Sequence, residues 1–268
     1  MSGHYPRISI ITPSFNQAQF LERTMRSVLD QGYPNLEYMV IDGGSTDGSV
    51  EIIRKYSDKL AYWVSEPDQG QTHAINKGLQ RATGVWVGWQ NSDDIYYPDA
   101  FMQMAQAAIR YPKAELIIGD MNLIDESDKV TRELIYVRPT YESLLAEGMI
   151  LSNQAALWRH SLHARIGWLN EALHYGFDFE WFLRVLRETD EAAHIPQCLG
   201  ALRYHDATKT SLSQALFVEE YRSILGGRIT PGWKKSFYQA RRMLLTLANG
   251  HFAYVLRGIK RRTLGSGR

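Results

Sequence analysis

The sequence predicts an α/β protein whose first half is Rossmann-like. Over residues 1–120, short apolar segments alternate with amphipathic ones, which is the pattern of parallel β-α-β units. The apolar segments end in loops rich in glycine and aspartate, whereas the segments between them have helical periodicity. With 268 residues, of which 44% are hydrophobic, the chain is long enough for one large domain with a buried core.

The expected elements follow one another in chain order. Strands are expected at 8–12, 36–41, 60–64, 85–89 and 115–118, and helices at 20–29, 49–56, 72–81 and 100–110. After Gly119 the alternation weakens, so residues 121–220 are interpreted as a second half of the same domain. There, strands are expected at 121–124, 130–137, 193–196 and 200–205, and helices at 141–147, 179–187 and 212–225.

The composition excludes several classes of protein. Cys198 is the single cysteine, which excludes an intramolecular disulfide and fits a reducing compartment, so we expect a cytoplasmic protein. Residues 1–7 lack the apolar segment of a signal peptide. No run of about 18 apolar residues exists for a membrane-spanning helix.

Charge is unevenly distributed along the chain. The net charge is +1, yet residues 221–268 hold 11 Lys and Arg with no Asp or Glu, whereas residues 1–220 hold 19 basic and 29 acidic residues, a net of −10. Within 231–262, basic residues flank apolar faces, which is typical of an amphipathic helix at an anionic membrane surface. Packing of this helical basic tail on its own domain is the alternative. Nucleic acid is disfavoured because the rest of the chain is acidic and no recognition module is present.

Three loops that follow predicted strands carry polar residues. They are T-P-S-F-N at 12–16, D-G-G-S-T-D-G at 42–48 and E-P-D-Q-G-Q at 66–71, and the helix after the third bears His73, Asn76 and Lys77 on one face. Because ligands bind beyond the carboxyl ends of strands in open α/β sheets, these loops are expected to meet at one crevice. Glycine permits close approach to a ligand, and helix N-termini suit a diphosphate. Taken singly, the loop at 42–48 is also explained as a strand-to-helix turn with Asp47 near the helix cap, and His73 as a solvated or capping residue.

The fourth strand is followed by N-S-D-D at 91–94. Adjacent carboxylates at the end of a strand suit Mg²⁺ or Mn²⁺, which prefer oxygen ligands and bridge to substrate phosphates. A helix cap before Pro98 and Asp99 is the alternative reading of this segment.

The order of these motifs, together with N-K-G at 76–78, resembles that of family 2 glycosyltransferases over roughly residues 7–211. The resemblance implies the GT-A fold, with residues 1–120 as the nucleotide-sugar half and 121–220 as the acceptor and catalytic half. It also implies inverting, metal-dependent transfer of a sugar from a nucleoside diphosphate sugar, with UDP or dTDP favoured and GDP as an alternative. A glycan or lipid-linked saccharide would be the acceptor, in cell-surface polysaccharide synthesis, and the basic tail would attach the enzyme to the cytoplasmic leaflet.

The resemblance also assigns roles to residues on the donor side. Asp93 would bind the metal with His205, and Arg203 or Lys209 would offset the charge of the leaving group. Asn91 departs from the family, because the first position of the D-x-D element is usually an aspartate. The expected donor-binding residues are Thr12, Pro13, Phe15, Asn16, Asp42, Gly44, Asp68, Gln69, His73, Asn76, Asn91, Ser92, Asp94 and Arg203.

On the catalytic side, the resemblance places the general base at Asp178, with Glu180 as the competing candidate. Both residues are also explained as acids at a helix N-terminus. The acceptor side is expected to include Ser152, Gln154 and Trp158. Tryptophan side chains that could stack on sugar rings, or belong to the core instead, are Trp89, Trp158, Trp168 and Trp181.

Two other functions are compatible with parts of the sequence. A sugar-nucleotide pyrophosphorylase shares the Rossmann-like start but needs a phosphate loop rich in Gly and Arg, and residues 12–16 contain neither. A glycan-binding protein with a decayed site is the non-enzymatic alternative, prompted by Asn91 and by Phe177, which occupies the place of a usual acid.

Overall fold

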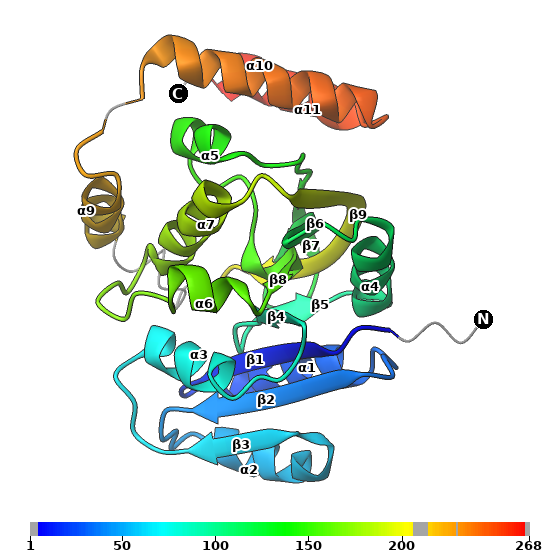
Figure 1. Cartoon of the computed structure of the whole chain (residues 1–268), viewed down its shortest axis with the longest axis vertical. Coiled ribbons are helices and arrows are strands. Elements are labelled where there is room, and N and C mark those ends of the chain that lie inside the picture. Colours follow the sequence, from blue (N-terminus) through cyan, green and yellow to red (C-terminus); the bar gives the residue numbers. More distant parts are fainter. Residues whose placement is uncertain (1–4, 206–213, 229, 266–268) are drawn as a thin grey trace.

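A computed structural model of the chain describes residues 5–205, 214–228 and 230–265. One nine-stranded sheet runs through the described part in the order β3-β2-β1-β4-β8-β6-β9-β5, and β7 pairs with β6 outside this path. The mixed α/β architecture predicted from the sequence is confirmed. Figure 1 shows the sheet with helices on both of its faces.

The first half contains the expected β-α-β units. The parallel strands are β1 (Ile8–Ser14), β2 (Leu36–Asp42), β3 (Tyr62–Ser65) and β4 (Trp86–Trp89). The helices are α1 (Ala18–Leu29), α2 (Ser49–Lys55), α3 (Gln71–Leu79) and α4 (Ala100–Arg110), and a short 3-10 helix, η1 (Ser57–Lys59), precedes β3. In Figure 1, α3 covers one face of β1 and β2, while α1 and α2 lie behind the other. Because both faces are covered, β1 is buried along its whole length.

The second half departs from the expected parallel order. The segments expected at 115–118 and 121–124 form one strand, β6 (Leu116–Ile124), which does not pair with β4. Strand β8 (Ala156–Arg159) lies between them and is antiparallel to both. Strand β8 was not predicted, because a four-residue buried segment has no alternating pattern. The short strand β5 (Ile95–Tyr96) was not predicted either.

Strand β9 (Ala192–Arg203) corrects a second expectation, since it replaces the two strands predicted at 193–196 and 200–205. It pairs parallel to β6, and its register shifts between Ile195 and Cys198. Pro196 lies in this irregular stretch, where its missing N–H removes no ladder hydrogen bond. The continuous strand carries Arg203 to the loop that follows β4.

The remaining elements surround the second half of the sheet. They are β7 (Val130–Leu134), α5 (Tyr141–Glu147), η2 (Asn153–Ala155), α6 (Leu162–Ile166), α7 (Phe177–Glu188) and α9 (Gln214–Ile224). Helix α5 begins at a capping box formed by Thr140 and Ser143. The predicted start of α9 at residue 212 lies outside the described residues.

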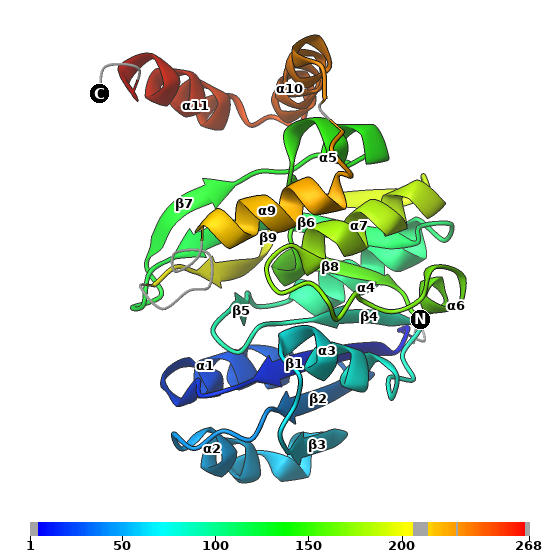
Figure 2. The ribbon, with the colours of Figure 1, turned by 90° about the vertical axis from the view of Figure 1, so that its left-hand side faces the viewer.

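The basic tail is helical, as expected, and forms α10 (Gly232–Ala248) and α11 (Phe252–Gly265). Figures 1 and 2 show both helices beyond α5, at the opposite end of the molecule from β3 and α2. The Arg242 guanidinium pairs with the buried Glu147 carboxylate at 2.8 Å, and the Thr230 hydroxyl donates to the Leu145 carbonyl at 3.0 Å. Polar contacts therefore join the start of the tail to α5.

The tail nevertheless leaves large apolar side chains in solvent. Trp233 is 68% exposed and Leu256 is 66% exposed. Phe237, Leu244 and Phe252 are exposed as well. Within the described residues, none of the helices has the length and apolar character needed to cross a membrane.

Candidate active site

A cavity of about 620 Å³ lies at the carboxyl ends of β1 and β4. Loops from both halves of the domain surround it, together with the first turn of α7 and Phe217 of α9. Its walls are formed by Pro13, Ser14, Phe15, Gln17, Gly43, Pro67, Asp68, Gly70, Gln71, Ala74, Asn91, Ser92, Asp93, Asp94, Ser152, Asn153, Gln154, His174, Tyr175, Phe177, Asp178, Leu202, Arg203, Tyr204 and Phe217. The crevice expected from the strand ends is therefore present.

The loop after β1 contributes some of its expected donor residues and not others. Pro13 and Phe15 line the cavity. Thr12 is instead fully buried, with its hydroxyl 3.0 Å from the Tyr38 hydroxyl. Asn16 lies outside the cavity, where its side-chain oxygen accepts a hydrogen bond from the Thr46 amide at 2.9 Å. Thr12 and Asn16 thus hold the loop rather than face a ligand.

Asp42, which was expected among the donor-binding residues, is engaged with protein groups. Its fully buried carboxylate accepts hydrogen bonds from the hydroxyls of Ser45 at 2.6 Å and Ser65 at 2.7 Å. The backbone amides of Gly44 and Ser45 donate to it as well, at 3.1 and 2.9 Å. Gly44 has a φ of 85°, which favours glycine, and does not line the cavity. Asp42 therefore shapes the turn that presents Gly43.

Gly43 and Asp68 meet at the cavity wall. A Cβ atom at position 43 would come within 2.7 Å of Asp68 Oδ2, so a larger residue at this position would displace the Asp68 carboxylate. The other carboxylate oxygen of Asp68 accepts a hydrogen bond from the Gly70 amide at 2.7 Å. Asp68 is thus held at the cavity with one oxygen beside Gly43.

The polar face of α3 does not reach the cavity. His73 accepts a hydrogen bond from the Gln69 amide at 3.3 Å, and neither residue lines the cavity. Asn76 is buried and donates to the Leu169 carbonyl at 2.9 Å. The buried Asn76 side chain is therefore a structural contact instead of the expected donor contact, whereas the donor contacts of Gln69 and His73 stay predictions. Asn76 joins α3 to the segment before α7, and Gln71 is the α3 residue with a polar side chain in the cavity wall.

The loop after β4 is held by a network of hydrogen bonds around Asp94. The Asp94 carboxylate is buried and accepts from the side-chain amides of Asn91 at 2.9 Å and Gln154 at 2.6 Å, and from the Arg203 backbone amide at 2.8 Å. Burial, followed by the charge of Asp93, raises the pKa of Asp94 well above its usual range. The network also explains Asn91, because a neutral amide can donate to Asp94 whereas an ionised carboxylate cannot.

Asp93 and His205 approach each other at the cavity. Asp93 Oδ2 lies 3.2 Å from His205 Nε2, and the imidazole packs on the Phe20 ring at 4.9 Å between centroids. No cluster of three or more His, Cys, Asp or Glu arranged to hold a metal is found among the described residues. Oxygen and imidazole ligands fit a Mn²⁺ or Mg²⁺ ion that takes its remaining ligands from substrate oxygens and water. The pair suits an ion shared with a bound diphosphate.

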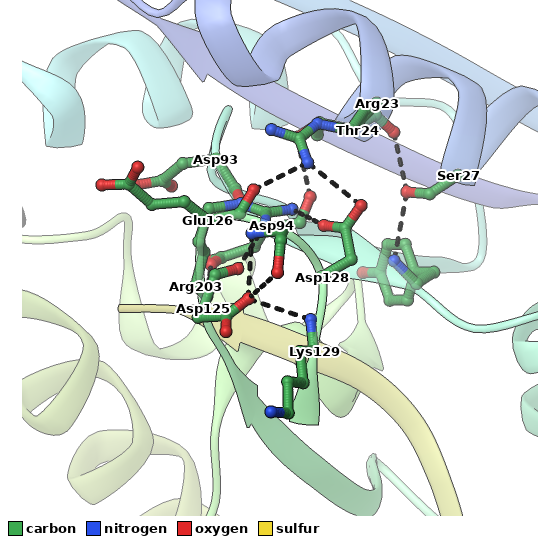
Figure 3. A network of polar contacts seen from close by, with 12 residues as sticks. Arg23, Thr24, Ser27, Asp93, Asp94, Asp125, Glu126, Asp128, Lys129 and Arg203 are labelled. Atoms are coloured by element: carbon green, nitrogen blue, oxygen red, sulfur yellow. Dashed lines mark hydrogen bonds and ion pairs between the residues drawn. The ribbon is translucent and has the colours of Figure 1, made fainter. Parts of the chain in front are cut away.

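Arg203 is buried and faces protein groups, which corrects its expected contact with a diphosphate. Figure 3 shows it between the loop after β4 and the β6–β7 turn. Its Nε donates to the Asp93 carbonyl at 2.8 Å, and its Nη1 donates to the Asp125 carbonyl at 2.7 Å. Its Nη2 lies 2.5 Å from Asp128 Oδ1, and Arg23 contacts the other oxygen of Asp128 at 3.0 Å. The second basic residue expected here, at position 209, lies outside the described residues.

The two acids at the start of α7 have different surroundings. Asp178 lines the cavity, and burial raises its pKa to about 6 although the Phe179 amide donates to it at 2.7 Å. Glu180 is outside the cavity wall and pairs with Arg184, with 2.6 Å between Oε1 and Nε. Of these two residues, the geometry leaves Asp178 as the candidate base.

The acceptor side is only partly as expected. Ser152 and Gln154 line the cavity, and the Ser152 hydroxyl donates to Gln154 Oε1. Trp158 is fully buried, and its indole N–H donates to His163 at 3.1 Å, so its expected contact with an acceptor is corrected. Trp89 and Trp181 are also fully buried in the core.

The aromatic residues at the cavity are different ones. Trp168 is partly exposed but stacks on His163, with centroids 4.4 Å apart, and does not line the cavity. Tyr175, Phe177 and Phe217 line it instead. No local pattern marks Phe217 as a cavity residue, because α9 reaches the cavity only through tertiary packing.

Comparison with known proteins identifies the family. The family model described as glycosyl transferase family 2 matches residues 9–156. An uncharacterized glycosyltransferase of Mycobacterium tuberculosis, Rv1514c, is 34% identical over 183 residues, covering 67% of this chain and 69% of the relative. The putative teichuronic acid biosynthesis glycosyltransferase TuaG of Bacillus subtilis is 32% identical over 145 residues, covering 51% of this chain and 58% of TuaG.

Solved structures share the fold at low sequence identity. TarS 1-349 of S. aureus in complex with UDP-GlcNAc matches with a TM-score of 0.67 and 17% identity, covering 87% of this chain and 69% of that one. The chain spans 43% of a longer TarS structure. The mannosyltransferase PcManGT of Pyrobaculum calidifontis, in complex with GDP-Man and Mn²⁺, matches with a TM-score of 0.64 and 18% identity, covering 99% and 82%. The chain belongs to the family 2 glycosyltransferases, and it is a glycosyltransferase with the GT-A fold.

Proposed function

We propose that this glycosyltransferase moves a sugar from a nucleoside diphosphate sugar to a hydroxyl of a glycan or lipid-linked saccharide, with inversion and with a divalent metal. The observation that carries the proposal is that Asp93 and Asp178 line one cavity of about 620 Å³ although they come from distant parts of the chain, and that His205 Nε2 lies 3.2 Å from Asp93 Oδ2. The complexes of TarS with UDP-GlcNAc and of PcManGT with GDP-Man support a nucleotide sugar as the donor.

The nucleotide is proposed to lie along the wall formed by Pro13, Phe15, Gly43 and Asp68. Asp68 Oδ2 could accept a hydrogen bond from the imide N–H of a pyrimidine, a role that the enclosed Asp42 carboxylate does not offer. A uracil or thymine base is therefore favoured, with guanine as the alternative.

Mn²⁺ or Mg²⁺ is proposed to be held by Asp93 and His205, where it would supply the positive charge that stabilises a leaving diphosphate. The Mn²⁺ in PcManGT supports this assignment. The buried Arg203 guanidinium, which pairs with Asp128, is not available for the same task.

Asp178 is proposed to take the proton from the acceptor hydroxyl as the acceptor oxygen attacks the anomeric carbon. Its pKa of about 6 leaves it mostly ionised at neutral pH and more basic than an ordinary aspartate. Because the attack comes from the face opposite to the departing diphosphate, the configuration at the anomeric carbon inverts. Ser152 and Gln154 would contact the acceptor from the neighbouring wall.

The donor and the reaction can be tested together. Purified enzyme is incubated with UDP-, dTDP- and GDP-sugars and Mn²⁺, and release of nucleoside diphosphate is measured. A glycosyltransferase releases the nucleoside diphosphate of its donor, which we expect to be UDP or dTDP, with GDP as the alternative. A pyrophosphorylase would form pyrophosphate from a nucleoside triphosphate and a sugar phosphate, and a decayed glycan-binding protein would show no turnover.

A role in cell-surface polysaccharide synthesis is proposed on the likeness to TuaG. We also propose that α10 and α11 bind an anionic membrane surface as a peripheral attachment of a cytoplasmic enzyme. Trp233 and Phe237 are exposed in a tail that holds basic residues and no acidic ones. Lipid-linked acceptors would be found at such a surface.

The membrane proposal is tested with the full chain and sedimented vesicles. Wild type is expected to bind phosphatidylglycerol vesicles more tightly than phosphatidylcholine vesicles, because the tail is basic. The double variant Trp233→Ser and Phe237→Ser should lose most of this binding, whereas Ile109→Ser, which changes an exposed apolar residue of α4, should keep it. Equal vesicle binding by all three proteins would show that Trp233 and Phe237 do not form a membrane-binding surface. A dimer that forms with increasing protein concentration, without vesicle binding, would assign these side chains to contact with a second copy of the chain.

A further inference from the structure

Helix α9 holds the backbone that leads into α7. The Glu220 carboxylate accepts three consecutive backbone hydrogen bonds, from His174 at 2.9 Å and from Tyr175 and Gly176 at 2.8 Å each. Gly176 is the N-cap residue of α7 and has no side chain to cap the helix. Backbone N–H groups at a helix start need acceptors from elsewhere, and Glu220 supplies one just ahead of this helix.

The charge of Glu220 suits this position. A carboxylate is stabilised near a helix N-terminus, and hydrogen bonds to an ionised acceptor are stronger than neutral ones. Burial opposes ionisation, but the three backbone N–H groups together hold the pKa of Glu220 below its usual range. The side chain is therefore ionised at neutral pH.

Apolar contacts seat α9 at the same place. The Tyr221 ring stacks on Phe179 of α7, with centroids 4.3 Å apart and an angle of 10° between the planes. A Cβ atom at Gly176 would come within 2.7 Å of Ile224 Cδ1, so this glycine admits α9 closely. Figure 2 shows α9 running beside α7. In the sequence, Asp178 thus lies between residues 174–176, whose backbone Glu220 holds, and Phe179, whose ring stacks on Tyr221.

We infer that Glu220 is a positioning residue that fixes the Asp178 carboxylate against the cavity. The inference rests on the proposed role of Asp178 as the base. His174 and Tyr175, which Glu220 also holds, line the cavity, so the same hydrogen bonds fix this part of its wall. The hydrogen bonds of Glu220 and the ring contact of Tyr221 do not involve the donor residues Pro13, Gly43 and Asp93. We therefore expect changes at Glu220 to leave the donor residues unaffected.

The test compares Glu220→Gln with Glu219→Gln, which changes the exposed neighbour on the same helix. Glu220→Gln keeps the shape but removes the charge and leaves one acceptor oxygen. The expected result is a loss in kcat of about tenfold to a hundredfold with an unchanged KM for the donor, because misplacing a catalytic group costs rate rather than donor binding. Glu220→Asp, whose side chain is one methylene shorter, should likewise lower kcat without changing the KM for the donor. Glu219→Gln should behave as wild type.

Two further measurements separate the outcomes. Faster amide exchange at 174–176 in Glu220→Gln, without a change at the loop 91–94, would support the positioning role. A folded Glu220→Gln or Glu220→Asp enzyme with kcat within twofold of Glu219→Gln overturns it, and so does a rise in donor KM with kcat unchanged. Asp178→Asn is measured in parallel. If that variant is fully active, the assignment of Asp178 as the base is wrong. If it is inactive while Glu220→Gln has wild-type activity, only the positioning role of Glu220 is wrong.

Discussion

The Nε of Arg203 donates to the backbone carbonyl of Asp93 at 2.8 Å, across 110 positions of sequence. The last residue of β9 thereby supports the loop that carries the candidate metal ligand, while its other guanidinium nitrogens contact the β6–β7 turn (Figure 3). Groups that orient metal ligands often matter almost as much as the ligands themselves.

Arg203→Lys is expected to weaken the protein and its metal site. A lysine keeps the charge but cannot reach the carbonyls of Asp93 and Asp125 and the carboxylate of Asp128 together. We expect the free energy of unfolding to fall by about 2–4 kcal/mol and Mn²⁺ affinity to fall about tenfold or more. Urea unfolding and Mn²⁺ titration check both values, with Arg132→Lys on the exposed surface of β7 as the control. An unchanged Mn²⁺ affinity in a destabilised variant would limit Arg203 to a purely structural role.

Asp93→Asn should remove metal-dependent activity. The amide cannot supply the negative charge that a divalent ion prefers, and the leaving diphosphate then lacks its counter-charge. We expect kcat with Mn²⁺ to fall by at least about a hundredfold. The measurement is the Mn²⁺ dependence of nucleoside diphosphate release, with the exposed Asp30→Asn as control. Wild-type dependence on Mn²⁺ in Asp93→Asn would remove Asp93 from the metal site.

Asp178→Asn should abolish transfer while donor binding stays intact, because Asp178 is not part of the wall proposed for the nucleotide, which consists of Pro13, Phe15, Gly43 and Asp68. Glu180→Gln is the matched control, since its carboxylate faces Arg184 and not the cavity. That control should keep transfer and lose only a modest amount of stability. Calorimetric titration with UDP and a transfer assay separate the two effects, and a fully active Asp178→Asn enzyme would reassign the base.

The pKa of Asp178 predicts how the reaction rate depends on pH. The base must be deprotonated to accept a proton, and burial raises the pKa of Asp178 to about 6. The rate should therefore fall as the pH drops through about 6 and approach a tenfold loss per pH unit below it. A profile of kcat against pH, recorded where the fold is intact by circular dichroism, tests the assignment. A rate that stays level down to about pH 4 would contradict it.

Asn91→Asp, which restores the residue expected from relatives, should harm this protein. The new carboxylate would face Asp94 Oδ2, which now accepts from the Asn91 amide at 2.9 Å, so a hydrogen bond is replaced by repulsion. We expect a loss of about 1–3 kcal/mol in the free energy of unfolding and no gain in Mn²⁺ affinity. Thermal unfolding and Mn²⁺ titration decide the matter. Tighter Mn²⁺ binding at unchanged stability would show that Asn91 weakens a metal site instead of holding Asp94.

Much of the first half could be predicted because its signals are local. Buried strands such as β1 and β2 are continuous apolar runs, amphipathic helices follow them, and their ends are marked by glycine and aspartate. The second half was less predictable, since β8 is too short to have a pattern and joins the sheet only through pairing with β4 and β6.

The sequence by itself determined the alternation of strands and helices, the order of the motifs, the basic tail and the place of the cavity at the strand ends. Only the tertiary structure decided which polar residues face that cavity. Thr12, Asp42 and Asn76 have the same residue types as ligand-binding groups, yet they satisfy buried partners. The physical reason is that a hydrogen-bonding side chain serves a ligand or a loop equally well. Which one it serves depends on neighbours that are distant in sequence, as Glu220 is from His174.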